Sequence, residues 1–310
     1  MSGVHHHDHD HQGERAQLTT RAAIFSVSVA LFLVGIKLWA TWETGSVAML
    51  GSLADNALDL IASLVTFFGV RYAAMPADEE HRFGHGKAEG IAALFQIILI
   101  SVSAIGIAWR GIDRFGSGER TQELELGVGV SAVAIAVTLA LLAYQRFVIA
   151  RTNSVAIQTD HVHYQSDLLL NLAVIAALLL DQVGNFPLAD PIFGVAIAAW
   201  LLWGAWRGGS HAIDQLMDRE WAPDKRERFL EMVKAHPDMH GIHELKTRTS
   251  GGQDFAQFHI WLDPRMTVSE AHDVMDEIEA RIHREFPGTE VLIHPDPKGL
   301  DEPGQDTTPE

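Results

Sequence analysis

The chain has 310 residues and a formal net charge of −17, and its two parts differ sharply in composition. Residues 20–211 consist mostly of long apolar runs, whereas residues 212–310 hold 22 acidic against 11 basic side chains, a net charge of −11. A surface this acidic disfavours nucleic acid as a partner and favours cations. The chain has no cysteine, which excludes disulfides and thiolate metal sites. A bound metal must therefore be held by Asp, Glu or some of the 17 histidines.

The first 19 residues are predicted to form a polar tail rich in His and Asp. Five histidines and two aspartates fall between positions 5 and 11: His5, His6, His7, Asp8, His9, Asp10 and His11. Two interpretations stay open for this tail, a loose metal-collecting segment or an incidental disordered terminus. The segment has neither the basic start nor the small-residue cleavage site that a signal peptide would need.

Six apolar stretches follow, each near the ~20 residues that a helix needs to cross the hydrocarbon core. They are Ala22–Trp42, Val47–Tyr72, Ile91–Trp109, Leu126–Tyr144, Val155–Leu180 and Pro191–Trp206. Lys37, in the last turns of the first stretch, is expected to snorkel to the membrane surface. The sequence therefore predicts a membrane α-helical domain with six transmembrane helices over residues 20–211.

The basic residues of the connections lie mostly on one side of the predicted membrane. That side carries Arg15, Arg21, Arg71, Arg82, Lys87, Arg146, Arg151 and Arg207, while the other carries Arg110, Arg114 and Arg120 and the turns at 43–46 and 185–187. By the positive-inside rule, this excess places both termini in the cytoplasm, which agrees with an even number of spans.

Two of the predicted spans carry ionisable side chains four residues apart. Asp55 and Asp59 share one face of the second span, and His163 and Asp167 share one face of the fifth. Ionisable groups at membrane depth are costly, and they usually mark an ion pathway. Three carboxylates and one imidazole suit a tetrahedral divalent ion such as Zn²⁺ and do not exclude Fe²⁺, Cd²⁺ or Mn²⁺. The alternative is that each pair caps a helix or forms hydrogen bonds within the bundle.

Two other polar groups admit both a functional and a plain structural interpretation. Asp160 and His161 lie nearer the start of the fifth span, where an interfacial or capping role is expected. Just past the second span, Asp78, His81 and His85 have a spacing that suits a metal. The two histidines could equally be solvated loop residues.

Residues 212–297 have the pattern of a small α/β domain, and residues 298–310 are expected to be disordered. The predicted elements are a helix over 223–235, strands over 242–249 and 254–262, a helix after the capping box at 267–270, and a strand over 291–294. Alternate residues from Ala256 to Leu262 are apolar, which leaves His259 on the opposite face of its strand. This αββαβ order predicts helices packed on a short sheet.

Together these motifs resemble those of the cation diffusion facilitator family, specifically its bacterial zinc and ferrous-iron efflux transporters. The resemblance rests on ADNALD in the second span, HYQSD in the fifth, the loop PADEEHRFGHGKAE, and GIHELKTR, FHIWL and LIHPDP in the soluble domain. It covers the chain from the first span to about Pro297 and leaves out the N-terminal tail. It implies six transmembrane helices and a metallochaperone-like cytoplasmic domain, in a homodimer of the bacterial cytoplasmic (inner) membrane.

The resemblance also implies roles for individual residues. The transport site would be Asp55, Asp59, His163 and Asp167, the second, loop site would be Asp78, His81 and His85, and Lys87 and Asp218 would form a charge interlock. A binuclear site at the domain dimer interface would be formed by His243, His259, His272, His294 and Asp296, with Asp296 bridging the two ions. For the interlock, a weak surface ion pair is the alternative. Pro295 is a departure from relatives in which a hydrogen-bonding residue can occur, and it affects contacts around the ligands rather than the ligands themselves.

The predicted function is export of Zn²⁺, with Fe²⁺ or Cd²⁺ as alternative ions, in exchange for protons by alternating access. The chain is therefore predicted to be a secondary transporter and not an enzyme, with metal ions, protons, the lipid bilayer and a second copy as partners. Zn²⁺ would also be a structural or regulatory ligand of the soluble domain. The alternatives are a non-transporting metal receptor that signals through the soluble domain, and a membrane metallohydrolase. The sequence lacks the His-Glu-x-x-His helix that would favour the hydrolase.

Overall fold

The computed structural model describes the backbone over residues 5–44, 47–117, 127–184 and 188–299. The side chains of residues 5–12, of Asp55 and Arg114, and of several other helical residues lie outside the described part. Residues 45–46 of the predicted turn at 43–46 also lie outside it, as do the predicted turn at 185–187, Arg120 and the tail from residue 300. The chain divides into two compact units: one is Gly13–Leu216, and the other combines Met217–Glu310 with Met1–Gln12.

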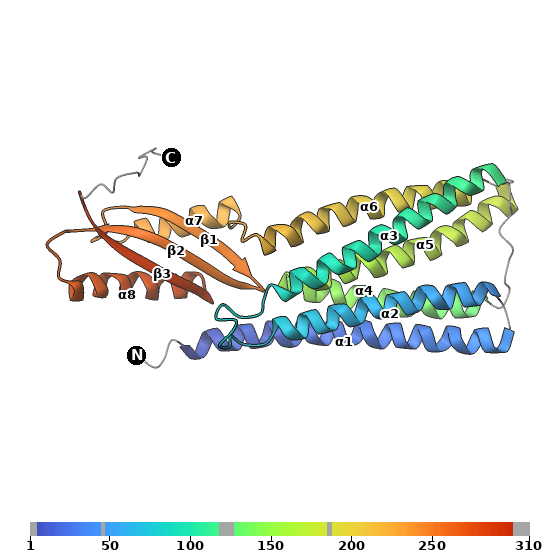
Figure 1. Ribbon diagram of the computed structural model, residues 1–310, viewed down its shortest axis with the longest axis horizontal. Helices are drawn as coiled ribbons and strands as arrows, with labels where there is room; N and C mark the ends of the chain where they lie inside the picture. Colours follow the sequence, from blue (N-terminus) through green and yellow to red (C-terminus); the bar gives the residue numbers. More distant parts are fainter. Residues whose placement is uncertain (1–4, 45–46, 118–126, 185–187, 300–310) are drawn as a thin grey trace. The chain divides into compact units, whose positions relative to one another are not determined.

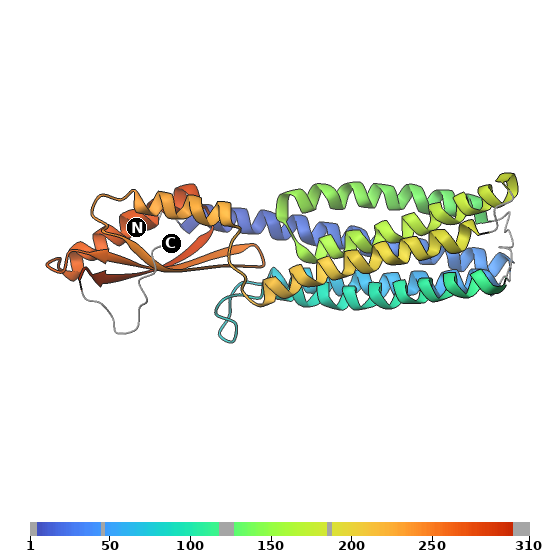
Figure 2. The ribbon, with the colours of Figure 1, turned by 90° about the horizontal axis from the view of Figure 1, so that it is seen from above.

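Six long helices account for the chain before Met217, and Figures 1 and 2 show their axes running roughly alongside one another. They are α1 (His5–Thr44), α2 (Val47–Ala73), α3 (Ala88–Ser117), α4 (Gly127–Thr152), α5 (Val155–Gly184) and α6 (Ala189–Leu216). Helix α5 is central, because it packs against α2, α3, α4 and α6. A side chain on α5 can therefore meet partners from most of the bundle.

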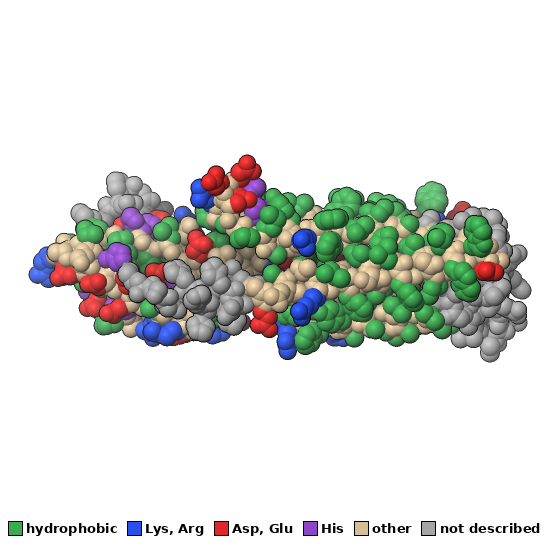
Figure 3. Space-filling model, turned by 90° about the horizontal axis from the view of Figure 1, so that it is seen from below, with side chains coloured by type: hydrophobic (Ala, Val, Ile, Leu, Met, Phe, Trp, Pro, Cys, Tyr) green, Lys and Arg blue, Asp and Glu red, His purple; other side chains and the backbone are tan. Residues whose placement is uncertain are grey.

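The surface of this helical unit is strongly apolar. Figure 3 shows hydrophobic side chains covering the visible face of the helices, and Trp109 and Trp206 are 75% and 79% exposed. Such extensive apolar exposure suits contact with lipid rather than water. By length and composition, four helices of the described part could cross a membrane, over Gly13–Glu43, Ala88–Asp113, Ala132–Thr152 and Pro191–Leu216. These segments belong to α1, α3, α4 and α6, whereas α2 and α5 carry the paired ionisable residues.

Most of the long helices extend beyond their predicted ends, α1 and α6 furthest. Helix α1 begins at His5, so residues 5–19 are helical where a loose or disordered tail was expected. The stretch from Glu14 to Leu18 is rich in good helix formers, and the guanidinium of Arg15 anchors it by donating to Glu89 Oε1 at 3.2 Å. Helix α6 runs past the predicted domain boundary at residue 211 because Ala212 is fully buried in an apolar cluster with Ala93.

Lys37, which the sequence predicts to snorkel to the membrane surface, has a polar partner on the neighbouring helix. Its ammonium group donates a hydrogen bond to Asn56 Oδ1 at 2.6 Å, and Asn56 is only 6% exposed. Since a charged group in an apolar bundle is stabilised by a polar partner within reach, the amide of Asn56 on α2 stabilises the Lys37 ammonium group. The side chain thus joins α1 to α2.

The second unit is a three-stranded sheet with two helices. Its elements are α7 (Pro223–Lys234), β1 (Ile242–Ser250), β2 (Gln253–Leu262), α8 (Val268–Glu285) and β3 (Thr289–Pro297). Strand β2 lies in the middle, antiparallel to β1 and parallel to β3. Helix α8 provides the crossover between the two parallel strands, and the predicted capping box of Thr267 and Glu270 starts it.

The hydrophobic core of this unit lies on one face of the sheet. Phe258 and Ile260 of β2 are buried against Phe229 of α7 and Ile278 of α8. Because side chains alternate along a strand, this packing leaves His259 on the face that the helices do not cover. The polar face of the sheet is therefore available to metal ligands.

Close packing of α2 on α3 depends on a glycine. A Cβ atom at Gly69 would overlap the Cβ of Ala92 and approach the carbonyl oxygen of Ala88 at 3.4 Å. Small residues at helix crossings allow such close approach in membranes, where van der Waals packing drives helix association. Gly106 of α3, by contrast, has no atom within 4 Å of its added Cβ.

We predict that Gly69→Val destabilises the helical unit, because the added atoms must push α2 away from α3. Overpacking of this kind costs about 1–3 kcal/mol. The measurement is the midpoint of thermal unfolding in detergent, which should fall for Gly69→Val and stay near the wild-type value for the matched variant Gly106→Val. Equal midpoints for the two variants would contradict the role of the crossing.

Candidate metal centres

Helices α2 and α5 bring three of the four predicted transport-site residues together. His163 Nε2 lies 3.1 Å from Asp59 Oδ1 and 3.8 Å from Asp167 Oδ2. One potential ligand atom from each residue lies within 4.8 Å of the others, and His163 is only 9% exposed. The side chain of Asp55 lies outside the described part, although its backbone is helical one turn before Asp59. We call Asp59, His163 and Asp167 the helix cluster.

The charge balance of the helix cluster favours a cation. Two carboxylates share one imidazole, and the neighbouring core of the helical bundle is largely apolar. A neutral imidazole and ionised carboxylates are the protonation states in which these groups bind metal. Imidazole and carboxylate donors together suit Zn²⁺ and other divalent first-row ions.

Asp160 is more deeply buried than the sequence predicted. It lies in the second turn of α5 with no exposed surface, so it does not cap the helix. Gln96 Nε2 donates to its Oδ1 at 3.0 Å and Gln145 Nε2 donates to its Oδ2 at 2.7 Å. His161 Nδ1 lies 3.2 Å from Gln145 Oε1, which places both residues in one polar cluster.

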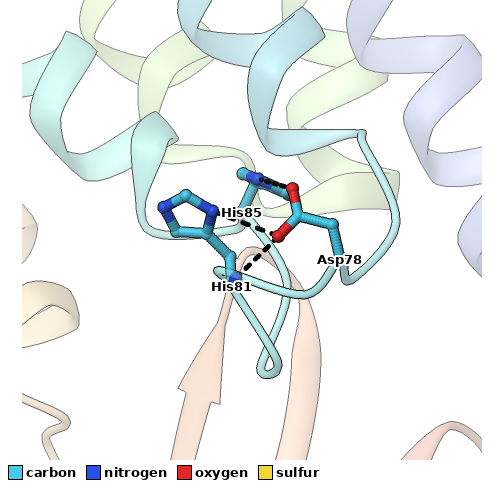
Figure 4. Close-up of side chains that lie close together, drawn as sticks. All are labelled: Asp78, His81 and His85. Carbon is cyan, nitrogen blue, oxygen red and sulfur yellow. Dashed lines mark hydrogen bonds and ion pairs between the residues drawn. The ribbon is translucent and has the colours of Figure 1, made fainter.

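The loop between α2 and α3 gathers the second predicted group, as Figure 4 shows. His81 Nδ1 lies 3.3 Å from Asp78 Oδ1, and His85 Nε2 lies 3.2 Å from Asp78 Oδ2. His85 is 5% exposed, and its ring meets Tyr72 edge-on with 4.6 Å between ring centroids. Each histidine thus offers a nitrogen beside one carboxylate, an arrangement that could bind a single divalent ion. We call these three residues the loop cluster.

Asp78 is held in place by its own loop. The backbone N–H groups of His81 and Glu80 donate to Asp78 Oδ1 at 2.6 and 2.9 Å. The hydrogen bond from the His81 N–H lowers the pKa of Asp78 below its usual value, because it stabilises the ionised carboxylate. The loop therefore presents a fixed anion to the two imidazoles.

Strand register builds the third group, on the open face of the sheet. His243, His259 and His294 occupy paired positions on β1, β2 and β3. Asp296 Oδ2 lies 3.2 Å from His243 Nε2 and 2.8 Å from His259 Nδ1, and Asp296 Oδ1 lies 3.3 Å from His294 Nε2. The two oxygens of Asp296 thus face different histidines, an arrangement that lets one carboxylate contact two ions. We call these four residues the sheet cluster.

His272, a predicted ligand, lies apart from the sheet cluster, and Glu244 lies near the cluster although the sequence did not predict it there. His272 is on α8, where its Nδ1 lies 3.3 Å from Asp276 Oδ1 of the same helix. Glu244 approaches His259 Nε2 at 3.9 Å, from a bulge in β1 where its φ is +52°. Alternation along a regular strand gives no indication of such a bulge, although the adjacency of Glu244 to His243 was visible.

The proposed interlock residues have partners of their own. Lys87 Nζ donates to the carbonyl oxygen of Leu216 at 3.2 Å, which ties the start of α3 to the end of α6. Arg248 donates to Asp218 Oδ1 at 3.3 Å, within the second unit. Both residues thus secure the segments on either side of the junction between α6 and the soluble domain. Their pairing with each other stays a prediction.

Comparison with known proteins gives matches over nearly the whole chain. Residues 23–217 match the cation efflux transmembrane domain, and residues 221–298 match the cytoplasmic domain of cation efflux proteins. The cation-efflux pump FieF of Yersinia enterocolitica is 42% identical over 285 residues, which cover 92% of this chain and 95% of that protein. FieF of Yersinia pestis is 42% identical over 282 residues, covering 91% and 94%. A solved chain described as "Mode of Action of a Putative Zinc Transporter CzrB" is 32% identical, with 26% of this chain and 99% of that chain covered and a TM-score of 0.25.

We expect the loop cluster to lose metal as the pH falls, because protons compete with the metal for its ligands. Metal ligands must be deprotonated, and protons compete for imidazole between about pH 7.5 and 5.5. Asp78, whose pKa is lowered, stays ionised throughout this range, so protonation of its carboxylate does not cause the loss. We expect Asp78→Ala to bind one Zn²⁺ fewer per chain than the wild type at about pH 7.5. At about pH 5.5 both proteins should bind an equal number.

Equilibrium dialysis of the full chain in detergent measures this difference. Glu79→Ala is the matched control, because Glu79 is an exposed carboxylate of the same loop. A zinc content that is the same in the wild type and in Asp78→Ala at every pH would contradict the loop cluster as a metal site.

Proposed function

The chain belongs to the cation diffusion facilitator family, and we propose that it exports Zn²⁺ from the cytoplasm in exchange for protons. The observation that carries this proposal is the helix cluster, in which two helices of an apolar bundle place two carboxylates and an imidazole within ligand distance. The relatives named as cation-efflux pumps support outward transport of a divalent cation by a transporter rather than catalysis by an enzyme. Fe²⁺ and Cd²⁺ are alternative cargoes, because the same donor set accepts them.

Exchange with protons follows from the charge of the transport site. With Asp55 as the fourth ligand, the transport site would contain three carboxylates and one histidine. When the metal leaves, these groups repel one another and lose hydration, so they take up protons in its place. When metal returns, it displaces those protons. Metal and proton occupancy exclude each other, which is the minimum requirement of an antiporter.

Alternating access requires the helix cluster to open to each side in turn. We propose that all six long helices span the membrane, with both termini in the cytoplasm, as the distribution of basic residues favours. Movement of α2 relative to α5 would change the distance between Asp59 and His163, and with it the affinity for metal. The inward-facing state would bind metal, and the outward-facing state would bind protons.

Two other functions fit the structure less well. A receptor that only signals would explain the sheet cluster but not the ligands inside the helical bundle, and the relatives are named as pumps. A metallohydrolase needs a metal-bound water and a nearby general base, together with access for an organic substrate. The helix cluster is a small group of side chains between packed helices, which suits an ion better.

We predict that Asp59→Ala abolishes proton-coupled zinc uptake into inverted membrane vesicles. Loss of a residue that only supports a ligand costs about 10–100-fold. Loss of a ligand should therefore reduce the initial rate by at least about a hundredfold. Asp113→Ala is the matched control, since Asp113 is an exposed carboxylate of α3 in the same unit. Wild-type rates for Asp59→Ala, with normal chromatographic behaviour, would refute the helix cluster as the transport site.

The soluble domain has a separate proposed role as a dimeric metal sensor. Two copies of this acidic domain repel each other, and Zn²⁺ bound at the sheet clusters would offset part of that repulsion. The full binuclear site would include His272. Metal in the cytoplasm would thereby draw two copies together and bias the helical unit toward transport. The family match over residues 221–298 supports metal binding and dimer formation by this domain.

The sensing role predicts a specific phenotype for His259→Ala. Its maximal transport rate at saturating zinc should remain within about twofold of the wild type, because the transport ligands are intact. The activation of transport by low cytoplasmic zinc should shift to higher concentration by about fivefold or more, in line with typical coupling energies. His240→Ala, an exposed histidine of the same domain, is the control. An unchanged activation curve for His259→Ala would contradict sensing.

A further inference from the structure

Asp160 is a buried acid that the proposed transport site does not use. It has no exposed surface, and neutral polar side chains from four other helices surround it: Ser26 of α1, Thr66 of α2, Gln96 of α3 and Gln145 of α4. Gln145 also donates to Ser26 Oγ at 3.0 Å, so the neighbours form one network. In the described part of the chain, no Lys or Arg forms an ion pair with Asp160. We call these five residues the Asp160 cluster.

If the Asp160 carboxylate is ionised, its neighbours offset little of the hydration free energy that it loses on burial. Two amide donors supply charge-assisted hydrogen bonds of about 1.5–3 kcal/mol each. Burying an uncompensated charge costs more than that, so such groups usually take up a cation or a proton. The titratable groups that face Asp160 are His163 and Tyr164, both on α5, and His161 reaches it through Gln145. None of them is a permanent cation.

The position of Asp160 connects it to the helix cluster. On α5, residues at spacings of three and four lie on one face, so Asp160, His163 and Asp167 follow one another along the helix. Asp160 is the member nearest the start of α5, where Ser154 donates to the buried Glu89 at 2.7 Å. The ionisable groups Asp160, His163 and Asp167 therefore follow one another along one face of α5.

A second observation indicates room for an exchangeable ligand. Gln96 Oε1 is buried, and among the described residues it has no hydrogen-bond partner, although Gln96 is only 1% exposed. A buried acceptor without a partner costs about 1–3 kcal/mol unless a donor reaches it. A water molecule or hydronium ion beside Asp160 would supply that donor. The Asp160 cluster thus combines an uncompensated acid with an unsatisfied acceptor.

We propose that Asp160 is a second proton-binding site, which carries one proton in addition to those exchanged at the transport ligands. In the absence of metal, Asp160 is the neutral carboxylic acid. When a divalent ion enters the helix cluster, its positive charge favours the ionised form, and the O–H bond of Asp160 breaks to give a carboxylate and a proton that passes to water. The reverse step accompanies metal release. This inference rests on the proposed metal–proton exchange.

Infrared difference spectroscopy of the full chain in detergent tests the proton directly. Metal-free protein near pH 7 should show a C=O band of a buried carboxylic acid that decreases when Zn²⁺ is added. Asp160→Asn should remove this band, and Asp113→Asn should keep it. Gln145→Leu should shift the band, because it removes the donor to Asp160 Oδ2. Absence of any acid band that depends on Asp160 would overturn the proposal.

The coupling is measured in reconstituted vesicles as protons moved per zinc ion. Asp160→Asn keeps the shape of the side chain and should lower this ratio by about one, while Asp160→Glu should restore part of it. An unchanged ratio in Asp160→Asn would overturn the extra proton. If the wild type moved zinc without protons, the proposed antiport would fail, whereas the infrared band would still decide whether Asp160 binds a proton.

Discussion

An ionised carboxylate inside a bundle of apolar helices loses its hydration, and this cost accounts for most polar contacts of the helical unit. The described acids of the interior meet the cost in three different ways. Glu89 is paired with the guanidinium of Arg15, Asp59 lies beside the imidazole of His163, and Asp160 is held by two amides. Of these partners, only the guanidinium of Arg15 is a permanent cation. The first contact is therefore structural, whereas Asp59 and Asp160 are the acids to which we assign exchangeable cations.

The two units use the same donor types but build their clusters in different ways. In the sheet cluster, backbone pairing fixes His243, His259 and His294 side by side before any metal binds. In the helix cluster, the distance between Asp59 and His163 depends on how α2 lies against α5. A rigid sheet suits a site that responds to the metal concentration. A site shared between two helices suits a change of affinity, because helices can move as whole bodies.

Much of this arrangement could be predicted from the sequence, because periodicity determines which residues share a face. The long helices and the elements of the soluble domain lie close to their predicted positions, and Asp59, His163 and Asp167 do meet. Periodicity does not determine how many neighbours cover a residue. The burial of Asp160 and the contact of Lys37 with Asn56 depend on helices distant in sequence, so the sequence alone predicted neither. The bulge at Glu244 was missed because it breaks the alternation on which strand prediction relies.

The loop cluster differs from both other clusters because a single short segment supplies all its ligands. The backbone of residues 80 and 81 holds the carboxylate of Asp78, and the ring of Tyr72 packs against His85. Its geometry therefore does not require α2 to keep one position relative to α5. An ion could remain in the loop cluster while the helix cluster changes its access, because local hydrogen bonds and not helix packing maintain it. We therefore expect the loop cluster to hold a metal ion near the start of α3 while the helix cluster changes its access.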